Sequence, residues 1–337
     1  MKKTIFTIVV STLCFALFAY IALAMLVIYK TSTLNDHCKS GVYARADNTT
    51  ERFYRTYKMH RESLDLSRWW FQSSSTVSIP SSTPNVQLKA TLANAKDAHQ
   101  WIIVVHGIEK CRFDYEVLVP ASMLLQSGFS VLMLDLREHG ESTRTTGRHT
   151  GGYYERQDIL AAWKWLQTHQ GVDAKNIGIY GVSFGAGSTA LAFGLEPNVQ
   201  AVWLDAPYAN MQAIIGSELK RLGLPSWMAG FVVHVWKQFR GIDLKALAPI
   251  DSMQRIGNRA LAVSYNINDA RTPASHGQSL CKAAKQHATH PDRILCYPHE
   301  QGVMITATQN IDYHVVGPLT EASWQQTISQ FFKKHLG

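Results

Sequence analysis

Residues 176–187 read Asn176-Ile-Gly-Ile-Tyr-Gly-Val-Ser-Phe-Gly-Ala-Gly187 and contain the pattern G-x-S-x-G around Ser183. Residues 176–180 are typical of a short buried strand, and the small apolar run 186–194 is typical of a helix packed on a sheet. A strand, this pattern and a helix in succession indicate a nucleophile elbow, a sharp turn that exposes the serine hydroxyl. Glycines two residues to either side let the strand and helix approach without a Cβ clash. We therefore expect Ser183 at the C-terminal edge of a sheet, with a helix N-terminus facing it.

The composition suits a folded protein of one large domain or two small ones, since 46% of the 337 residues are hydrophobic. The formal net charge of +8 comes from scattered Lys and Arg, which favours a solvated basic surface and argues against nucleic-acid binding. The patterns C-x-x-C, H-E-x-x-H, G-x-x-x-x-G-K and G-x-G-x-x-G are absent from the sequence. Their absence argues against zinc, P-loop and dinucleotide chemistry, so we expect no metal and no organic cofactor.

An almost unbroken apolar run covers residues 4–29, with Lys2 and Lys3 before it and Lys30 after it. About 26 helical residues at ~1.5 Å each reach ~39 Å, enough to cross a ~30 Å hydrocarbon core with tilt. The alternative is a cleaved signal peptide with small residues of 22–24 at its cleavage site, but the apolar run continues past them. We therefore expect an uncleaved signal-anchor helix. The two lysines favour a cytoplasmic N-terminus, which predicts a single-pass protein of the bacterial inner membrane with its main domain in the periplasm.

Beyond the anchor the sequence divides into a polar juxtamembrane connector, 30–74, and a folded domain, 75–337. Strands of an antiparallel entry hairpin are expected at 76–79 and 86–92. Further strands are expected at 101–105, 130–134, 176–180, 201–204, 260–265 and 293–297, and helices at 121–128, within 151–170, and at 186–194, 275–287 and 320–335. This alternation predicts an α/β fold with a mostly parallel central sheet and helices on both faces. Residues 209–255 have apolar helical stretches without an obvious strand, which predicts a small helical cap.

Polar residues end four of the expected strands: His106, Asp135, Ser183 and Asp205. The C-terminal ends of parallel strands are where such sheets bind ligands. Ser183 as a nucleophile would need two backbone N–H donors for the oxyanion. We expect these donors to be Phe184, the residue after the nucleophile, and Ile108 in the loop after strand 101–105.

A serine hydroxyl also needs a general base, and the base needs an orienting acid. In a sheet of this kind the acid and then the histidine follow the serine in sequence. Asp269, just past a late strand, is the expected acid, and Asp205 is the alternative. His314 is the expected base, and His299, directly after the last strand, is the alternative.

A family resemblance rests on several motifs that occur in the same order in a known superfamily. They are Val104-Val-His-Gly107, Asp135-Leu-Arg-Glu-His-Gly-Glu-Ser142, Asp158-Ile-Leu-Ala-Ala-Trp163, the elbow, Asp205-Ala-Pro-Tyr208 and Asn268-Asp-Ala-Arg-Thr-Pro-Ala-Ser-His276. With them, roughly residues 75–337 resemble the α/β-hydrolase superfamily, and within it serine hydrolases related to the prolyl oligopeptidase and acyl-esterase or thioesterase branches. The acid motif departs from the family pattern at 265–267, and 299–311 resembles an insertion. The family's spacing from the base to the end of the last helix favours His314.

Together with the apolar run 4–29, the resemblance implies a membrane-anchored serine hydrolase that cleaves a carboxylic ester or thioester of a small-molecule or lipid-like acyl substrate through an acyl-enzyme. A serine peptidase or acyltransferase of the same fold is one alternative, and a non-catalytic binding or scaffold protein is another. Two further alternatives concern Cys281 and Cys296, which flank a helix-to-strand connection and are either bridged or free. Nothing in the sequence indicates an oligomeric state.

Overall fold

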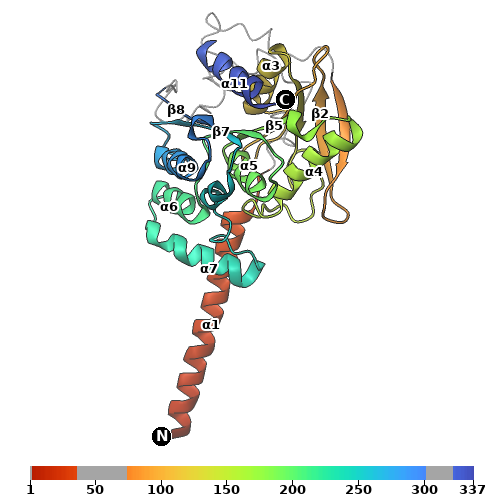
Figure 1. The fold of residues 1–337 in the computed structure, drawn as a ribbon. Helices are drawn as coiled ribbons and strands as arrows, with labels where there is room; N and C mark the ends of the chain where they lie inside the picture. Colours follow the sequence, from red (N-terminus) through yellow and green to blue (C-terminus); the bar gives the residue numbers. More distant parts are fainter. Residues whose placement is uncertain (1, 36–73, 301–321) are drawn as a thin grey trace, which may run out of the picture.

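The computed structural model describes residues 2–35, 74–300 and 322–337 (Figure 1). Its centre is an eight-stranded sheet with the order β1-β2-β4-β3-β5-β6-β7-β8. β2 pairs antiparallel with β1 and β4, and all other neighbours pair parallel. The strands are β1 (Ser75–Pro80), β2 (Gln87–Ala93), β3 (Trp101–Val105), β4 (Ser130–Leu134), β5 (Ile177–Val182), β6 (Ala201–Asp205), β7 (Ala260–Asn266) and β8 (Ile294–His299). The α/β-hydrolase fold expected from the sequence is confirmed.

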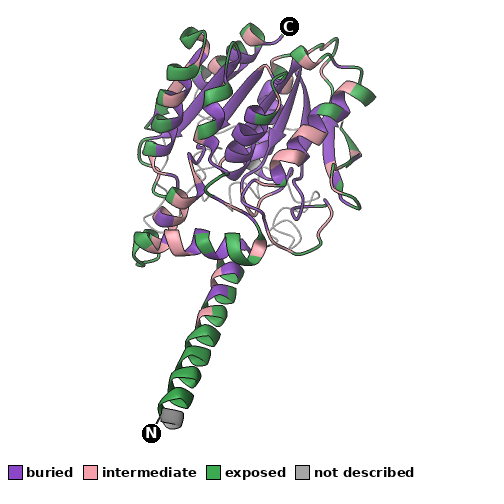
Figure 2. Ribbon diagram, turned by 60° about the horizontal axis from the view of Figure 1, so that its bottom comes forward, coloured by how far each residue is buried: buried purple, intermediate pink, exposed green. Residues whose placement is uncertain are grey.

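Helices cover both faces of the sheet, and the side chains of each central strand alternate between the two covers. Ile102 and Val104 of β3 join a core formed with α3 (Tyr115–Gln126) and α11 (Ala322–His335). Ile103 and Val105 join the opposite core, formed with α4 (Glu155–His169), α5 (Phe184–Leu195) and α9 (Ala274–His287). Figure 2 shows the central strands buried throughout. This double burial explains why the parallel strands read as continuous apolar runs.

The cap consists of α6 (Met211–Arg221), α7 (Ala229–Arg240) and the short α8 (Pro249–Ser252). α1 (Lys2–Ser32) extends away from the globular body and packs against α7 near its C-terminal end (Figure 1). The chain that leaves α1 pairs with the loop before α4. The backbone N–H of Leu34 donates to the Gly147 carbonyl (2.9 Å), and the backbone N–H of His149 donates to the Ser32 carbonyl (3.0 Å). The C-terminal end of α1 is therefore bonded to the folded domain.

Two helices differ from the sequence expectation. α3 begins at Tyr115 rather than 121, because the Asp114 carboxylate accepts from the Glu116 N–H (3.1 Å) and so caps the helix ahead of Pro120. Pro120 removes one backbone donor, and the apolar burial of α3 on both sides of it keeps the helix intact. α1 runs three residues past the expected end of the apolar run, to Ser32.

The structure joins Cys281 of α9 to Cys296 of β8 in a disulfide, with 5.9 Å between the Cα atoms, so the bridged alternative holds. Cys111 is disulfide-bonded as well, and Cys14 in α1 is a free thiol. Most of the juxtamembrane connector lies outside the described residues, and so does His314.

Candidate active site

Ser183 occupies the sharp turn between β5 and α5. Its backbone angles, φ 50° and ψ −112°, lie in a region that non-glycine residues rarely adopt. The Ser183 N–H donates to the Asp205 carbonyl (2.7 Å), which ties the turn to the neighbouring strand β6. A Cβ on Gly181 would lie 2.7 Å from the Gly185 carbonyl oxygen, and a Cβ on Gly185 would lie 2.7 Å from that of Val105. Only glycine allows this approach, so the two glycines maintain the strained position of Ser183.

Ser183, Phe184 and Ile108 line one cavity of about 270 Å³. Phe184 is the first residue of α5 and follows Ser183 directly, and Ile108 lies in the loop after β3 and lines the same cavity. Residues of α6, and Lys30 and Thr31 of α1, contribute to the lining. A larger cavity of about 700 Å³ within the cap is lined by no proposed catalytic residue among the described ones. The smaller cavity is therefore the candidate site.

The loop that carries Ile108 is held by buried polar contacts. The Gly107 N–H donates to the Glu116 carboxylate at the start of α3. His106 donates from Nδ1 to the Gly107 carbonyl (2.7 Å) and accepts the Leu136 N–H at Nε2 (3.1 Å). Burial lowers the pKa of His106 to about 4, so the ring is neutral near pH 7 and bridges the ends of β3 and β4. This arrangement gives His106 a structural role.

His149 connects the end of α1 to the elbow, and its role had no signal in the sequence. The ring donates from Nε2 to the Thr31 carbonyl (2.9 Å) and accepts the Gly151 N–H at Nδ1 (3.1 Å). Its centroid lies 5.4 Å from the Phe184 ring, edge to face, and 5.4 Å from the Trp236 ring of α7. Burial lowers the pKa of His149, which favours the neutral ring that these bonds require. The end of α1 is thus linked to Phe184, the proposed oxyanion residue, through His149.

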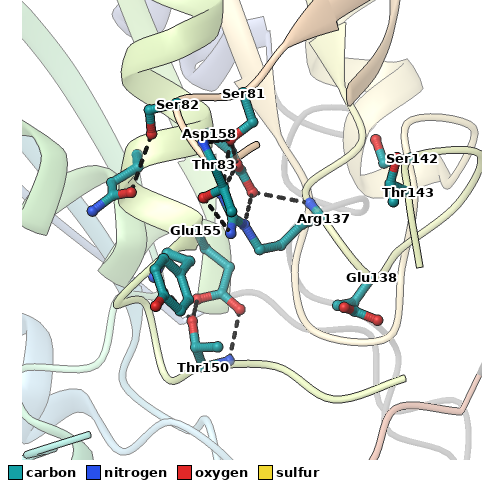
Figure 3. A network of polar contacts seen from close by, with 12 residues as sticks. Ser81, Ser82, Thr83, Arg137, Glu138, Ser142, Thr143, Thr150, Glu155 and Asp158 are labelled. Carbon is teal, nitrogen blue, oxygen red and sulfur yellow. Dashed lines mark hydrogen bonds and ion pairs between the residues drawn. The ribbon is translucent and has the colours of Figure 1, made fainter. Parts of the chain in front are cut away.

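A buried ion-pair network fixes the loop that leads to His149 (Figure 3). Arg137 donates to the Asp158 carboxylate through Nε (2.8 Å) and Nη2 (2.6 Å). Glu155, one turn before Asp158 in α4, accepts the Thr150 N–H (2.7 Å). Arg137 and Thr150 are thus both attached to α4. Since residues 138–149 lie between them in the chain, the network restricts the position of His149. The charged motif after β4 is thus structural, although the sequence singled it out only as part of a family pattern.

Asp269 lies in the loop after β7. Its Oδ1 accepts the N–H groups of Arg271 (2.7 Å) and Thr272 (2.9 Å), and both of these residues line the Ser183 cavity. The carboxylate therefore organises the turn at the edge of the site. Asp205, the alternative acid, is buried and accepts from the Tyr180 hydroxyl (3.1 Å).

His299 ends β8 and pairs in register with Asn266 at the end of β7. Its ring is buried edge-on against Trp324 of α11 at 4.6 Å. It is not among the described residues that line the Ser183 cavity. Within the described residues, 2–35, 74–300 and 322–337, no group of three His, Cys, Asp or Glu residues could hold a metal ion.

Comparisons with known proteins agree with this architecture. The sequence model of the prolyl oligopeptidase family matches residues 115–337. An uncharacterized 31.7 kDa protein of the traX-finO intergenic region of Escherichia coli is 26% identical over 133 residues, which are 39% of this chain and 45% of that protein. Protein ABHD12B of Homo sapiens is 25% identical over 209 residues, 60% of this chain and 54% of that protein. The chain thus spans about half the length of the curated relatives it matches.

A solved structure shows the same fold. The Pyrococcus furiosus esterase Pf2001 superimposes with a TM-score of 0.62 at 20% identity, covering 81% of this chain and 96% of the esterase. The family match covers about two thirds of the chain and includes the elbow, α5 and the sheet strands from β4 onward. As the sequence motifs predicted, the chain belongs to the prolyl oligopeptidase family, within the α/β-hydrolase superfamily of serine hydrolases.

Proposed function

We propose that the protein is a membrane-anchored serine hydrolase that cleaves carboxylic esters or thioesters through an acyl-enzyme. The observation that carries this proposal is the position of Ser183, on a strained turn at a cavity that it shares with Phe184 and Ile108. A hydroxyl presented in this way beside backbone donors suits attack on an acyl carbon. The family membership supports the same chemistry.

In the proposed reaction the Ser183 Oγ attacks the acyl carbon while His314 takes the hydroxyl proton and Asp269 orients the imidazole. The N–H groups of Phe184 and Ile108 stabilise the oxyanion. The bond from the acyl carbon to the leaving oxygen or sulfur then breaks, and His314 returns the proton to the leaving group. Water, deprotonated by the same histidine, attacks the acyl carbon of the acyl-enzyme. The bond from this carbon to the Ser183 Oγ then breaks, His314 returns the proton to the Oγ, and the acid is released. His299 and Asp205 remain the alternative base and acid.

The cavity lining supports an acyl substrate. Met211, Ile214, Ile215 and Leu219 of α6 form an apolar wall, which suits a hydrocarbon chain. A charged group on the substrate would lose hydration where it meets these four side chains.

Two features support anchoring in a membrane with the main domain outside the cytoplasm. Residues Ile5–Ser32 of α1 have a mean hydropathy of 2.4 and are long enough to cross a bilayer. The disulfide between Cys281 and Cys296, together with the bonded Cys111, suits an oxidising compartment. For a bacterial chain this compartment is the periplasm.

The test is turnover of p-nitrophenyl esters of increasing chain length by the full-length protein, compared with Ser183→Ala. Removal of a triad nucleophile costs on the order of 10⁶ in kcat. Ser188→Ala is the matched control, because Ser188 is a buried serine of α5, the helix that follows Ser183, and does not line the cavity. This variant should retain turnover. His314→Gln and His299→Gln, measured side by side, identify the base.

Three outcomes would contradict the proposal. Equal turnover by Ser183→Ala and the wild type would exclude Ser183 as the nucleophile. Turnover of peptide amides in preference to all esters would favour the serine peptidase alternative. A folded wild-type protein that neither turns over esters nor reacts with a fluorophosphonate probe would favour the scaffold alternative.

A further inference from the structure

Helix α7 packs an apolar stripe across α1. The rings of Phe231 and Phe239 lie 6.1 and 6.2 Å from the ring of Tyr20, and Val235, midway between them, is buried against α1. Positions 231, 235 and 239 recur every four residues, so they share one face of α7. Figure 1 shows α7 crossing α1 at the part of the globular body nearest to the exposed stretch of the anchor. Figure 2 shows that this stretch of α1 is exposed.

The stripe continues into an exposed apolar corner between α6 and α7, which we call the cap lip: Leu222, Leu224 and Trp227. Trp227 stands four residues before Phe231, in the short 3₁₀ helix Ser226–Met228 that leads into α7. The exposed fractions are 63% for Leu222, 45% for Leu224 and 77% for Trp227. Clustered apolar exposure of this kind marks a contact surface for a membrane or a protein.

The position of α7 along α1 favours a membrane. A hydrocarbon core of ~30 Å takes ~20 helical residues, so a span that begins at Ile5 ends near Ala24. The α1 residues that meet α7, from Tyr20 to Ile28, lie within about one turn of that boundary. Tryptophan and tyrosine concentrate at this boundary in membrane proteins. The cap lip directly precedes α7, which crosses α1 at this level, so the lip is held near the lipid interface as well.

Charge near the lip also favours lipid over an apolar protein partner. Lys220 and Arg221 end α6 directly before Leu222, and both are exposed. Long basic side chains can lay their apolar stems along a bilayer and extend their charges to lipid phosphates. Lys30, at the end of α1, lies close to the same level and lines the Ser183 cavity.

The lip is continuous with the candidate site, because Leu222 lines the Ser183 cavity as well. On the basis of the proposed function, we infer that the cap lip inserts into the lipid interface beside α1, and that an acyl lipid enters the cavity directly from the bilayer between α1 and α6. The substrate class is then an ester or thioester whose acyl chain resides in the membrane. The anchor holds the domain at the surface, and the lip sets the orientation in which the cavity opens to lipid.

The experiment uses the full chain in phosphatidylcholine vesicles and two esters with one leaving group, soluble methylumbelliferyl acetate and membrane-dissolved methylumbelliferyl oleate. The variant Leu224→Ser/Trp227→Ser changes lip residues outside the cavity lining. We expect its acetate turnover to equal that of the wild type and its oleate turnover to fall by about tenfold, because the lip no longer inserts. Leu195→Ser is the matched control, since Leu195 is also 45% exposed but lies at the far end of α5. It should leave both activities unchanged.

A second measurement does not depend on catalysis. The emission difference between the wild type and Trp227→Leu reports Trp227 alone, and vesicles with brominated acyl chains should quench it. Quenching with a selective loss of oleate turnover supports the inference. If the wild type turns over acetate but the lip variant keeps its oleate turnover, or if Trp227 is not quenched, the inference is wrong while the proposed function stands. If Trp227 is not quenched and the lip variant loses self-association that the wild type shows, the lip binds a second copy of the chain instead of lipid. A wild type inactive on both esters would contradict the proposed function instead.

Discussion

The sheet wall of the Ser183 cavity, formed by Ile108, Ser183 and Phe184, is built from backbone turns that buried bonds and glycine contacts hold in place. The opposite wall, formed by the end of α1 and by α6 residues from Met211 to Leu219, consists of side chains on two helices that belong to no strand of the sheet. The comparison indicates that the two walls are suited to different tasks. The sheet wall is suited to bond-breaking chemistry, which requires fixed geometry. In the proposed function the wall of α1 and α6, which we call the anchor-and-cap wall, selects and delivers the acyl chain.

Gly185→Ala should have the largest effect, because the added Cβ would collide with the carbonyl oxygens of Val105 and His106 at the sheet wall. Backbone atoms cannot move aside, so α5 must shift and displace the Phe184 N–H. We expect turnover of a short soluble ester to fall by more than about 10²-fold and the free energy of unfolding to fall by about 1–3 kcal/mol.

The matched control for this change lies in the cap. A Cβ on Gly230 of α7 would come no closer than 3.9 Å to any neighbour, so Gly230→Ala should keep its turnover and gain helix propensity. Chemical denaturation and ester kinetics on both variants compare the two walls directly. Equal damage from the two substitutions would show that the cap is as tightly specified as the elbow.

Glu116→Gln tests the next layer of the sheet wall, since the Glu116 carboxylate holds the Gly107 N–H beside the proposed donor Ile108. The amide keeps an acceptor but loses the charge, which weakens the bond. We expect kcat to fall about 10-fold with little change in KM, less than the 10²–10³ that follows removal of an oxyanion donor.

Glu218→Gln is its counterpart on the opposite wall, where Glu218 lines the cavity and bonds Arg271 (3.2 Å). It should alter KM and leave kcat for a short ester within about threefold. A drop in kcat for Glu218→Gln as large as for Glu116→Gln would remove the proposed division between the walls.

The pH dependence of stability should also come from the sheet side. Burial lowers the pKa of His106 to about 4 and that of His139 to about 3, below the ordinary value of 6.5. As pH falls below about 6.5, these histidines bind protons in the unfolded chain but stay neutral in the folded protein. Their contribution to the free energy of unfolding is therefore complete above that pH and is lost toward pH 4. For His106 alone the expected loss between pH 7 and pH 5.5 is about 1 kcal/mol.

Urea denaturation at the two pH values measures this loss. His106→Asn should flatten the dependence even though it lowers the stability at pH 7, because the substituted residue does not titrate. His234→Asn, an exposed position of α7, should leave the dependence unchanged. An unaltered slope in His106→Asn would show that other groups control acid unfolding.

The sheet wall was predictable from the sequence because its signals are local. Continuous apolar runs located the parallel strands, since both faces of the sheet are covered, and G-x-S-x-G placed Ser183 between β5 and α5. The contribution of α1 to the site was not predictable. The His149 ring bonds the backbone carbonyl of Thr31, more than 100 residues away in the chain. Since every residue has a backbone carbonyl, such a bond leaves no pattern in the sequence. His314 as base and Asp269 as acid stay predictions, because the structure does not describe His314.

Thr31→Val should have the smallest effect, at the point where the anchor-and-cap wall is bonded together. The Trp236 indole N–H of α7 donates to the Thr31 hydroxyl (2.8 Å), and valine keeps the shape but removes this acceptor. Because the contact is only partly buried, water can replace it, so we expect a loss of about 0.5–1 kcal/mol in the attachment of α1 to α7. That loss should appear as a rise of less than about threefold in KM for long-chain esters, with short-ester kcat unchanged. Thr12→Val is the control and should have no effect, since among the residues that the structure describes Thr12 bonds only within α1, to the Ile8 carbonyl (2.9 Å). If Thr31→Val lowered kcat for the short ester instead, the anchor would act on the chemistry through His149 and Phe184, and the two walls would form a single unit.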